Sequence, residues 1–399
     1  MDLTSGYPYS LVRYGLPYNY PRLDKSLHTD VIILGGGISG ALTAYELAKA
    51  GIPAVILDGR TMGLGSTSAS TSLLQYEIDV PLTKLAEKIG EQQAAKAYEL
   101  CYRSIHQIEQ ICKKLKFPLF ENKHSLYLAS HKKDIALISK EFKARKALGF
   151  EVEYWEADKI EKMMGFSAPG AIYSHTAAQT DAYMLTHALH QHNIKNGIAV
   201  FDSTRATDVT HQRTGVTVTT SEGHTIKAKF LVVATGYEAI QYIKEPLIKL
   251  HSTYAVVSEA VPQEKIWHEN CLIWETKDPY LYMRTTSDNR VLVGGRDEEF
   301  YNPSRRDKLI AKKAKELEKD FGKKFPHISF IPEFKWTGTF ATTDDGLPFI
   351  GHYDGMPHTL FALGFGGNGI TFSQIAAEMI TDIIKGKKNK AADIFSFGR

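Results

Sequence analysis

Hydrophobic positions near the amino end of the chain follow two successive patterns. Val31–Leu34 is a short, wholly apolar run, which is typical of a strand buried on both faces. A helical pattern then continues through Ala50 and stops at Gly51. A second apolar run, Ala54–Leu57, ends in Asp58. The three segments predict a β–α–β unit of about thirty residues.

Hydrophobic spacing elsewhere predicts further helices and strands. Apolar residues three to four positions apart predict helices, and short apolar or alternating runs predict strands. The predicted helices are 82–115, 131–148, 180–195, 305–321 and 373–385. The predicted strands are 126–129, 199–201, 207–209, 216–219, 225–228, 230–234 and 361–363, with more in 249–294 and 336–351. Strands of the wholly apolar type lie far apart along the chain, so the domain that they build is expected to be discontinuous.

Composition and charge restrict the class of protein. Hydrophobic residues make up 43% of the 399 residues and charged residues 23%, as in ordinary globular proteins. The net charge of +3 is too small to predict a nucleic-acid partner. Three widely spaced cysteines, Cys101, Cys112 and Cys271, favour a reducing compartment and predict no disulfide framework. With no secretory signal or transmembrane segment expected, the predicted location is the cytoplasm.

Histidines give no metal signal, and no metal is expected. His187, His190 and His192 lie on the predicted 180–195 helix and are expected to be half exposed. Their spacing does not match the pair four residues apart that helical zinc sites use.

A glycine motif follows the first predicted strand. Gly35-Gly36-Gly37-Ile38-Ser39-Gly40 fits G-x-G-x-x-G, in which the glycines allow a tight turn, a close approach to pyrophosphate, and close packing of helix on strand. The helix N-terminus then faces the phosphate charge. Asp58 ends the second strand, where an acid accepts bonds from ribose hydroxyls and would repel the extra phosphate of NADP. The motif predicts a dinucleotide site but does not distinguish NAD from FAD.

The segment after Asp58 favours FAD. Residues 63–72 read Gly-Leu-Gly-Ser-Thr-Ser-Ala-Ser-Thr-Ser, a run of small and hydroxyl side chains. A simple dehydrogenase would continue here into another β–α unit. Small residues instead let a long, extended cofactor lie against the backbone. The alternative for this segment alone is a flexible serine-rich loop.

Three later segments carry a family resemblance. The predicted strand 230–234 ends in Ala234-Thr235-Gly236, Trp336–Gly351 contains Thr-Asp-Asp-Gly-Leu-Pro, and Gly364–Ile370 reads Gly-Phe-Gly-Gly-Asn-Gly-Ile. Together with the amino-terminal motif they resemble the D-amino-acid oxidase superfamily of FAD-dependent oxidoreductases, which includes glycine, sarcosine and γ-glutamylputrescine oxidases. The resemblance extends from about residue 30 to 385.

The resemblance implies an α/β fold class with α+β inserts. A discontinuous Rossmann-like FAD-binding domain, formed by residues 30–80, 165–240 and 336–390, would carry an inserted antiparallel β-sheet domain that binds substrate. The substrate-binding domain would comprise residues 81–164 and 241–335. Residues 1–29, rich in Tyr and Pro, are expected to form an extended arm on the body.

The same resemblance implies which residues hold FAD. The ADP half and pyrophosphate would contact Gly35, Gly37, Ile38, Ser39, Gly40, Asp58, Gly59, Arg60, Gly65, Ser66, Thr67 and Ser68, and the adenine would contact Ala206 or Thr207. The remaining contacts, mostly with the flavin, would come from Leu73, Leu74, Gln75, Ala234, Thr235, Gly236, Gly364, Gly366, Gly367, Asn368, Gly369, Ile370 and Thr371. A glycine-rich turn before a helix aims N–H groups and a positive dipole end at one point, which would stabilise the negative charge of reduced flavin. Since residues 336–351 contain neither Cys nor His, FAD is expected to be bound non-covalently.

Departures from the family bear on the substrate. Relatives that oxidise amino acids clamp the carboxylate with an arginine near 338–341 or in the carboxy-terminal loop, and this chain has none in either place. Arg284 is the remaining candidate clamp, against the alternative of a structural ion pair. Tyr254, Trp274, Tyr282 and Trp336 are candidates to line an amine cavity, against the alternative of ordinary core. In sarcosine oxidases a lysine assists the reaction with oxygen, and the corresponding position in this chain is near Leu292. The lack of that lysine favours a dehydrogenase over an oxidase.

These features predict an enzyme and leave two other functions open. FAD would accept a hydride at N5 from the carbon beside the nitrogen of a small amine or amino acid, giving an imine, with O2 or another electron acceptor. The alternatives are oxidation of a C–O bond in a 2-hydroxy acid or polyol phosphate, and a non-catalytic flavin-binding or sensing protein. The oligomeric state is not predicted.

Overall fold

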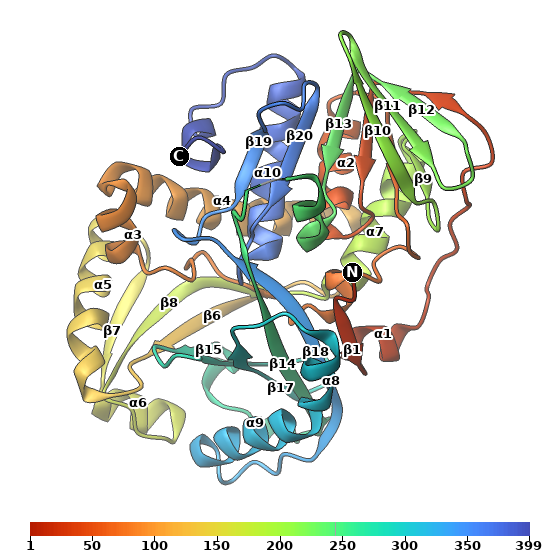
Figure 1. Ribbon diagram of the computed structural model, residues 1–399. Helices are drawn as coiled ribbons and strands as arrows, with labels where there is room; N and C mark the ends of the chain where they lie inside the picture. Colours follow the sequence, from red (N-terminus) through yellow and green to blue (C-terminus); the bar gives the residue numbers. More distant parts are fainter. Residues whose placement is uncertain (244) are drawn as a thin grey trace.

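The computed structural model describes residues 1–243 and 245–399, and the strands in this part of the chain form three sheets (Figure 1). Strand β3 (Val31–Leu34), helix α2 (Ile38–Lys49) and strand β4 (Ala54–Leu57) confirm the predicted β–α–β unit. They belong to a six-stranded sheet with β9 (Ala199–Phe201), β13 (Phe230–Val233), β19 (Phe349–His352) and β20 (Thr359–Leu363). Its order is β19-β20-β13-β3-β4-β9, and only β19 and β20 are antiparallel neighbours.

The six-stranded sheet is covered on both faces. Helices α2, α7 (Ala182–Lys195) and α10 (Gly369–Ile384) pack on one face, where Val31 and Ile33 point. Ile32 and Leu34 point to the other face, which packs on a four-stranded sheet. That sheet is formed by β10 (Ala206–Gln212), β11 (Gly215–Thr220), β12 (Thr225–Ala228) and β2 (Leu27–His28). Burial on both faces explains why β3 and β4 are wholly apolar.

A ten-stranded sheet forms the second half of the molecule. Its strands are β1 (Thr4–Gly6), β5 (Leu73–Leu74), β6 (Glu121–Leu128), β7 (Val152–Glu156), β8 (Gly170–Gln179), β14 (Lys249–Ala260), β15 (Leu272–Glu275), β16 (Leu281–Thr285), β17 (Arg290–Glu298) and β18 (Pro332–Thr342). The order is β1-β18-β14-β17-β16-β15-β6-β8-β5, with β7 also paired to β8. The sheet is mixed, because β6 and β15 are parallel where only antiparallel pairs were expected. It also includes β8 and all of β18, which the predicted segments 165–240 and 336–390 assign largely to the FAD-binding domain.

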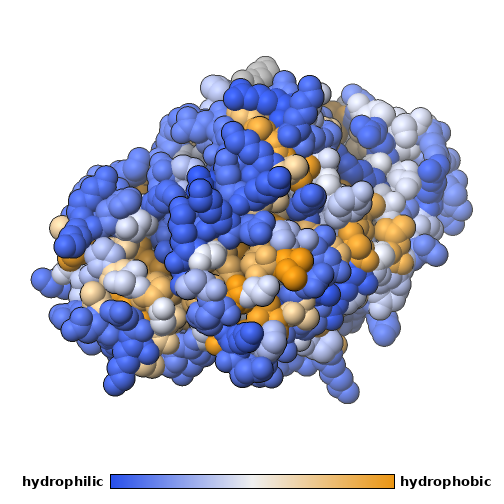
Figure 2. Space-filling view, turned by 90° about the horizontal axis from the view of Figure 1, so that it is seen from below, coloured by the Kyte–Doolittle hydropathy of each residue, from blue (hydrophilic) through white to orange (hydrophobic). Residues whose placement is uncertain are grey.

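Helices cover the outer surfaces of this sheet (Figure 1). Helices α6 (Ala157–Met164) and α9 (Ile310–Lys324) pack on one side, and α3 (Leu82–Ile89), α4 (Glu91–Leu115) and α5 (Ile135–Ala147) surround the β6–β8 end. The single helix predicted over 82–115 is two helices, because Gly90 has φ 89° and interrupts it. The helix predicted over 305–321 is also two, α8 (Pro303–Lys308) and α9. Figure 2 shows the underside as largely hydrophilic, with hydrophobic areas among the hydrophilic residues.

Residues 1–29 are not extended throughout. They contain β1, the short helix α1 (Tyr9–Tyr14) and β2, so a helix interrupts the predicted extended arm. Pro8 pre-sets the backbone at the start of α1, and Tyr9 packs into a cluster with Leu292 and Trp336. No helix in residues 1–243 and 245–399 combines the length and apolarity needed to cross a bilayer.

Candidate functional site

A cavity of about 330 Å³ lies where the six-stranded and ten-stranded sheets meet. Its walls come from both ends of the chain: the turn after β3, the serine-rich segment before β5, and the glycine-rich turn between β20 and α10. Side chains of β14, β15, β16 and β18 close the far side. The cavity therefore brings together segments that are more than three hundred residues apart in the sequence, from Gly35 to Ile370.

The glycine turn after β3 has no room for side chains. Gly35 has φ 108°, and a Cβ there would lie 2.4 Å from the carbonyl oxygen of Ala234. A Cβ on Gly40 would lie 1.9 Å from the carbonyl oxygen of Gly35, and one on Gly37 would lie 2.8 Å from Thr67 Oγ1. The turn, the helix packing and the contact with the serine-rich segment thus each require glycine.

Asp58 stands at the end of β4 on the cavity wall. Its Oδ2 accepts the N–H of Gly36 at 2.7 Å, and its Oδ1 accepts the N–H of Arg60 at 2.8 Å. Burial raises the pKa of Asp58, and these two backbone bonds act against the rise. Arg60 in turn forms a bidentate pair with Glu238 at 2.6 and 2.8 Å, which links β4 to the turn after β13.

Two histidines expected to be half exposed are fully buried behind the glycine turn. His190 Nε2 donates to the carbonyl oxygen of Gly36 at 2.9 Å. His187 Nδ1 is hydrogen-bonded to the hydroxyl of Tyr20 at 2.8 Å. Burial lowers the pKa of each histidine to about 4. The expectation was wrong because α7 packs between α2 and residues of the arm.

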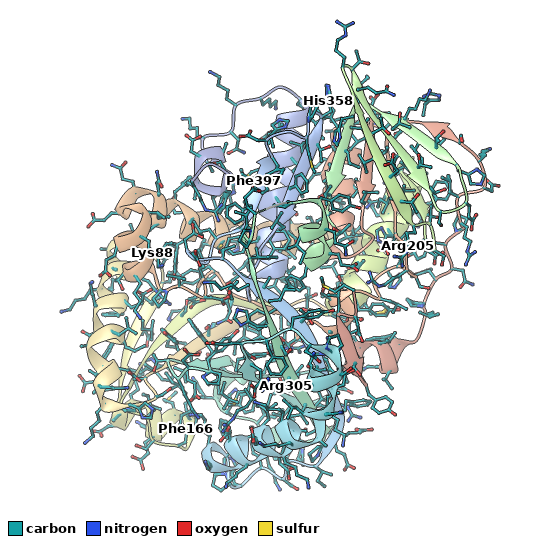
Figure 3. All side chains as sticks on the ribbon, in the orientation of Figure 1. Lys88, Phe166, Arg205, Arg305, His358 and Phe397 are labelled. Atoms are coloured by element: carbon teal, nitrogen blue, oxygen red, sulfur yellow. The ribbon has the colours of Figure 1, made fainter. Side chains whose placement is uncertain are left out.

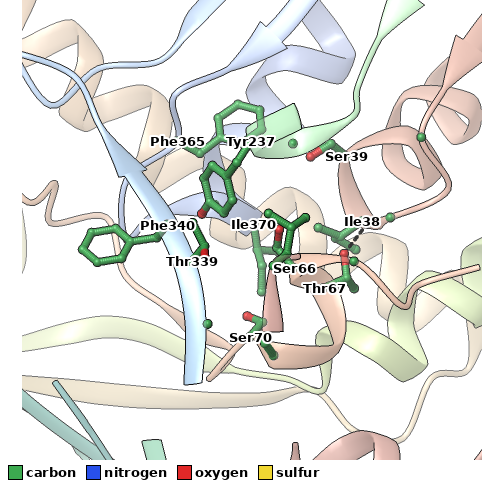
Figure 4. A pocket seen from close by; sticks show the side chains of 18 of the residues that line it. Ile38, Ser39, Ser66, Thr67, Ser70, Tyr237, Thr339, Phe340, Phe365 and Ile370 are labelled. Carbon is green, nitrogen blue, oxygen red and sulfur yellow. Dashed lines mark hydrogen bonds between the residues drawn. The ribbon is translucent and has the colours of Figure 1, made fainter. Parts of the chain in front are cut away.

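The serine-rich segment forms a short 3-10 helix, Ser66–Ala69, against the start of α2. Thr67 Oγ1 accepts the N–H of Ile38 at 3.1 Å, the contact drawn as a dashed line in Figure 4. Across the cavity, the Thr235 hydroxyl is buried and has no hydrogen-bond partner within the described residues. A glycine cradle, a helix N-terminus, an acid at the strand end and an unsatisfied hydroxyl together fit a bound dinucleotide.

The carboxy-terminal glycine turn faces the same cavity. Helix α10 begins at Gly369 rather than at the predicted Ser373, so its first residues lie on the wall. The N–H of Gly367 donates to Asp79 Oδ2 at 2.7 Å. The side-chain amide of Asn368 donates to the carbonyl oxygens of Gln75 and Glu77, at 3.2 and 2.8 Å. The turn is thereby tied to the segment that follows β5.

Most of the residues implied to contact FAD meet at this cavity. Those that line it are Gly35, Gly37, Ile38, Ser39, Asp58, Gly59, Arg60, Gly65, Ser66, Thr67, Leu73, Gln75, Ala206, Ala234, Thr235, Gly236, Gly366, Gly367, Asn368, Gly369 and Ile370. Those outside its wall are Gly40, Ser68, Leu74, Thr207, Gly364 and Thr371. Gly40 still acts on the site through its packing against Gly35.

Arg284 is not on the cavity wall, and the structure does not support its role as a carboxylate clamp. Its side chain is buried on β16, where Nε donates to the carbonyl oxygen of Thr71 at 2.6 Å. One terminal nitrogen donates to the carbonyl oxygen of Thr285 at 2.8 Å. Through the first of these bonds Arg284 holds the serine-rich segment, and its role as a clamp stays a prediction.

The four aromatic candidates divide into two pairs. Trp274 and Tyr282 are half buried and present surface to the cavity, whereas Tyr254 and Trp336 are buried core residues at its edge. Trp274 stacks on Tyr127 with ring centroids 3.7 Å apart. The ring of Tyr282 lies across Gly294, where a Cβ would come within 2.3 Å of it.

Sequence reasoning missed several wall residues. Tyr237, Tyr280, Glu77 and Asp79 line the cavity. Tyr237 directly follows the Ala-Thr-Gly turn, so its position was a usable signal. Asp79 lies in a stretch where apolar Tyr76, Ile78 and Val80 alternate with polar residues, and this alternation was a usable signal for Glu77 and Asp79 that was missed.

Comparisons with known proteins agree with this geometry. Residues 30–383 match a family model described as DAO, FAD dependent oxidoreductase. The chain is 22% identical to γ-glutamylputrescine oxidoreductase of Escherichia coli, with 92% of this chain and 86% of that protein covered. It is 26% identical to glycine oxidase of Geobacillus kaustophilus, with 92% and 96% covered.

The fold is also shared with solved structures. The crystal structure of glycine oxidase from Geobacillus kaustophilus superposes with a TM-score of 0.76 at 20% identity, over 91% of this chain and 96% of that one. The chain therefore shares its overall fold with this glycine oxidase structure over most of its length.

Proposed function

Because the chain belongs to the DAO family of FAD-dependent oxidoreductases, we propose that it oxidises the C–N bond of a small amine or amino acid. The names of two relatives, glycine oxidase and γ-glutamylputrescine oxidoreductase, support a substrate of this kind. The observation that carries the proposal is one cavity that joins the glycine turns of both ends of the chain to half-buried aromatic side chains.

The wall residues fall into two groups, which would bind different parts of the cofactor. Gly35, Gly37, Asp58 and the 3-10 helix Ser66–Ala69 would hold the dinucleotide half, while the turn before α10 would lie along the flavin ring. Bound FAD would supply the two-electron acceptor for a hydride that leaves the carbon beside nitrogen. The N-terminal end of α10 would favour the negative charge that follows.

An alkylamine is mostly an ammonium ion in neutral water, so it must release one proton to solvent before it is oxidised, and the hydride step itself needs no further proton transfer. As the C–H bond breaks, the nitrogen lone pair forms the C=N bond, so the substrate must bind as a neutral amine. Tyr237, Trp274 and Tyr282 would exclude water and orient the C–H bond. This agrees with a cavity wall that includes no histidine within the described residues.

We expect FAD to be held without a covalent bond. The cavity wall contains no cysteine or histidine among the described residues, and the side chains that most often attach flavin are therefore remote. Cys101, Cys112 and Cys271 are all buried elsewhere.

The test is an anaerobic titration of the purified, FAD-loaded protein with amines, amino acids, 2-hydroxy acids and polyol phosphates. We expect the absorption band of oxidised flavin to bleach with at least one amine or amino acid. Re-oxidation on admitting air would identify O2 as an acceptor, and persistence of reduced flavin would identify a dehydrogenase. Bleaching by a hydroxy acid or polyol phosphate alone would contradict C–N oxidation. A protein that takes up no FAD would contradict the whole proposal.

A further inference from the structure

The described basic side chains on the cavity wall are confined to one of its two regions, where Asp58 and Glu238 lie beside them. The basic wall residues in the described part of the chain are Arg60 and Arg205, and both belong to the dinucleotide region near Gly59. Figure 3 shows Arg205 in the half of the molecule that holds the four-stranded sheet. The region near the α10 turn carries two acidic residues, Glu77 and Asp79, and no basic one within the described residues. A substrate at this end therefore meets negative charge.

Glu77 and Asp79 differ in how that charge is balanced. Glu77 is fully buried and faces the guanidinium of Arg145, with its Oε1 3.3 Å from a terminal nitrogen. Asp79 has no ion-pair partner among residues 1–243 and 245–399, and its side chain is exposed inside the cavity. At this end of the wall, Asp79 is thus the carboxyl group without an ion pair; burial raises its pKa, and the N–H of Gly367 acts against the rise.

The position of Asp79 is fixed by the glycine turn. Its Oδ2 accepts the N–H of Gly367 at 2.7 Å. A Cβ on Gly366 would lie 2.6 Å from Oδ2, and one on Gly367 would lie 2.7 Å from Oδ1. The absence of side chains at these two glycines therefore leaves the space that the carboxylate occupies, next to the turn where the flavin is expected.

The surroundings of Asp79 favour a cation. Tyr237 and Tyr280 line the same region and lie within electrostatic range of Asp79. Trp274 and Tyr282 add two further half-buried rings. Aromatic faces attract ammonium groups, and the effect is larger where water is excluded.

A second carboxyl group lies behind this wall. Asp297 is hydrogen-bonded to the Thr253 side chain, which lines the cavity, and its Oδ1 is buried without a hydrogen-bond partner in the described residues. Burial raises the pKa of Asp297 to about 7, and the nearby charge of Asp79 adds to the rise. A cation bound at Asp79 would ease the repulsion between the two groups.

We propose that Asp79 is a specificity residue that binds a second ammonium group of the substrate, so that diamines or polyamines are preferred over amino acids. This inference rests on the proposed C–N oxidation. The amine that is oxidised must be neutral, so a fixed carboxylate matches a different, positively charged group of the same molecule. A substrate carboxylate in the same position would be repelled by Asp79 and would find no arginine to bind it.

The first test compares three ligands of equal carbon-chain length: an α,ω-diamine, the n-alkylamine and the ω-amino acid. The measurement is the concentration that half-reduces the flavin of the FAD-loaded protein under anaerobic conditions. A charge-assisted hydrogen bond predicts that the diamine needs about ten- to a hundredfold less than the alkylamine. The ω-amino acid should need the most. Preference for the amino acid, or equal values for diamine and alkylamine, would overturn the inference even if Asp79 variants do not fold.

The second test is Asp79→Asn, which keeps the shape and an oxygen that can accept the N–H of Gly367. We expect the diamine-to-alkylamine preference to fall to near one. The matched control, Asp158→Asn, removes an exposed carboxylate on α6 and should keep the preference of the native protein. Flavin absorbance of the purified variants reports whether FAD is still bound.

The outcomes distinguish the role of Asp79 from the proposed C–N oxidation. An equal loss with both amines in Asp79→Asn, with the preference intact, would mean that Asp79 acts on the oxidised amine itself, and would overturn its role at the second ammonium. Bleaching by amines without any diamine preference would remove only the role of Asp79. A protein that binds FAD but is bleached by no amine would remove C–N oxidation as well.

Discussion

Because Gly40 has no side chain, α2 can lie close to the turn before it. The carbonyl oxygen of Gly35 occupies the place where a Cβ would be, at 1.9 Å. The contact is with backbone, which cannot rotate away as a flexible side chain can. Steric exclusion at this one atom therefore holds the helix N-terminus against the cavity.

Gly40→Ala should weaken FAD binding strongly and lower stability by about 1–3 kcal/mol, because overpacking must displace α2 or the turn. Flavin retention after gel filtration and chemical unfolding would measure the two effects. Gly322→Ala is the control: Gly322 lies in α9, has no positive φ, and leaves open space within 4 Å of the position that a Cβ would take. It should raise stability by about 0.5–1 kcal/mol and leave FAD binding intact. Equal FAD affinity in both variants would show that the close approach at Gly40 is not needed.

Residue type alone was a poor guide to the substrate end of the site. Arg284 had the chemistry of a carboxylate clamp, but it lies off the cavity wall, and two of its nitrogens donate to the carbonyl oxygens of Thr71 and Thr285. The alternating pattern around Asp79 could have marked its polar face, but not its contact with Gly367, which joins residues 288 positions apart. Such contacts depend on tertiary structure, which no local spacing encodes.

At the scale of elements, α7 supports the glycine turn from behind. His190 anchors the carbonyl of Gly36, and His187 lies between Tyr20 and Tyr183, with ring centroids 5.7 and 4.7 Å away. The helix couples the arm to the dinucleotide turn through two buried, neutral imidazoles. Charging either ring would cost desolvation energy.

The free energy of unfolding should consequently fall in acid. Both histidines have a pKa of about 4 in the folded state, below the value near 6.5 of an unfolded chain. Their contribution to the free energy of unfolding is therefore complete above pH ~6.5. It decreases as the pH falls toward 4, by an amount on the order of several kcal/mol. Chemical unfolding across this range would measure the slope.

His187→Asn should make that slope shallower, because Asn does not titrate. His28→Asn, at an exposed position on β2, is the control and should leave the slope as it is in the native protein. Identical slopes in all three proteins would contradict the assignment of acid sensitivity to α7.

Elements with strong hydrophobic patterns were predicted well, and their ends were not. The wholly apolar β3 and β4 were correct to the residue, since burial on both faces leaves a clear signal. The start of α10 was placed four residues late because Gly369 and Ile370 follow a glycine-rich turn that suggests a loop. The break at Gly90 was missed because the apolar spacing continues on both sides of it.

At the scale of the whole molecule, the cavity lies between two sheets, and the core under the six-stranded sheet continues into the β6–β8 end of the larger one. Another core fills the space between the ten-stranded sheet and α9. The order and direction of strands in the larger sheet could not be predicted from the sequence, because strands such as β6 and β15 pair across about 150 residues. The discontinuous nature of the first sheet was predictable from where its apolar strands lie.

A ligand held by both halves should stabilise the entire fold. We expect removal of FAD, by dialysis against a chaotropic salt, to lower the thermal midpoint by several degrees, and added FAD to restore it. With free FAD about a hundredfold above its dissociation constant, linkage predicts about 2.7 kcal/mol. Differential scanning calorimetry would measure the shift. Flavin that stays with the denatured polypeptide would contradict non-covalent binding, and an unchanged midpoint would contradict a site shared by both halves.

Strand β1 pairs with β18, so its residues have partners that are translated more than three hundred residues later. During synthesis β1 stays unpaired until β18 has left the ribosome. The edge of the large sheet, and with it the wall that Leu3 contributes to the cavity, can close only after β18 has been translated. We therefore expect FAD to bind after both glycine turns have been translated, and not to a chain that is still growing.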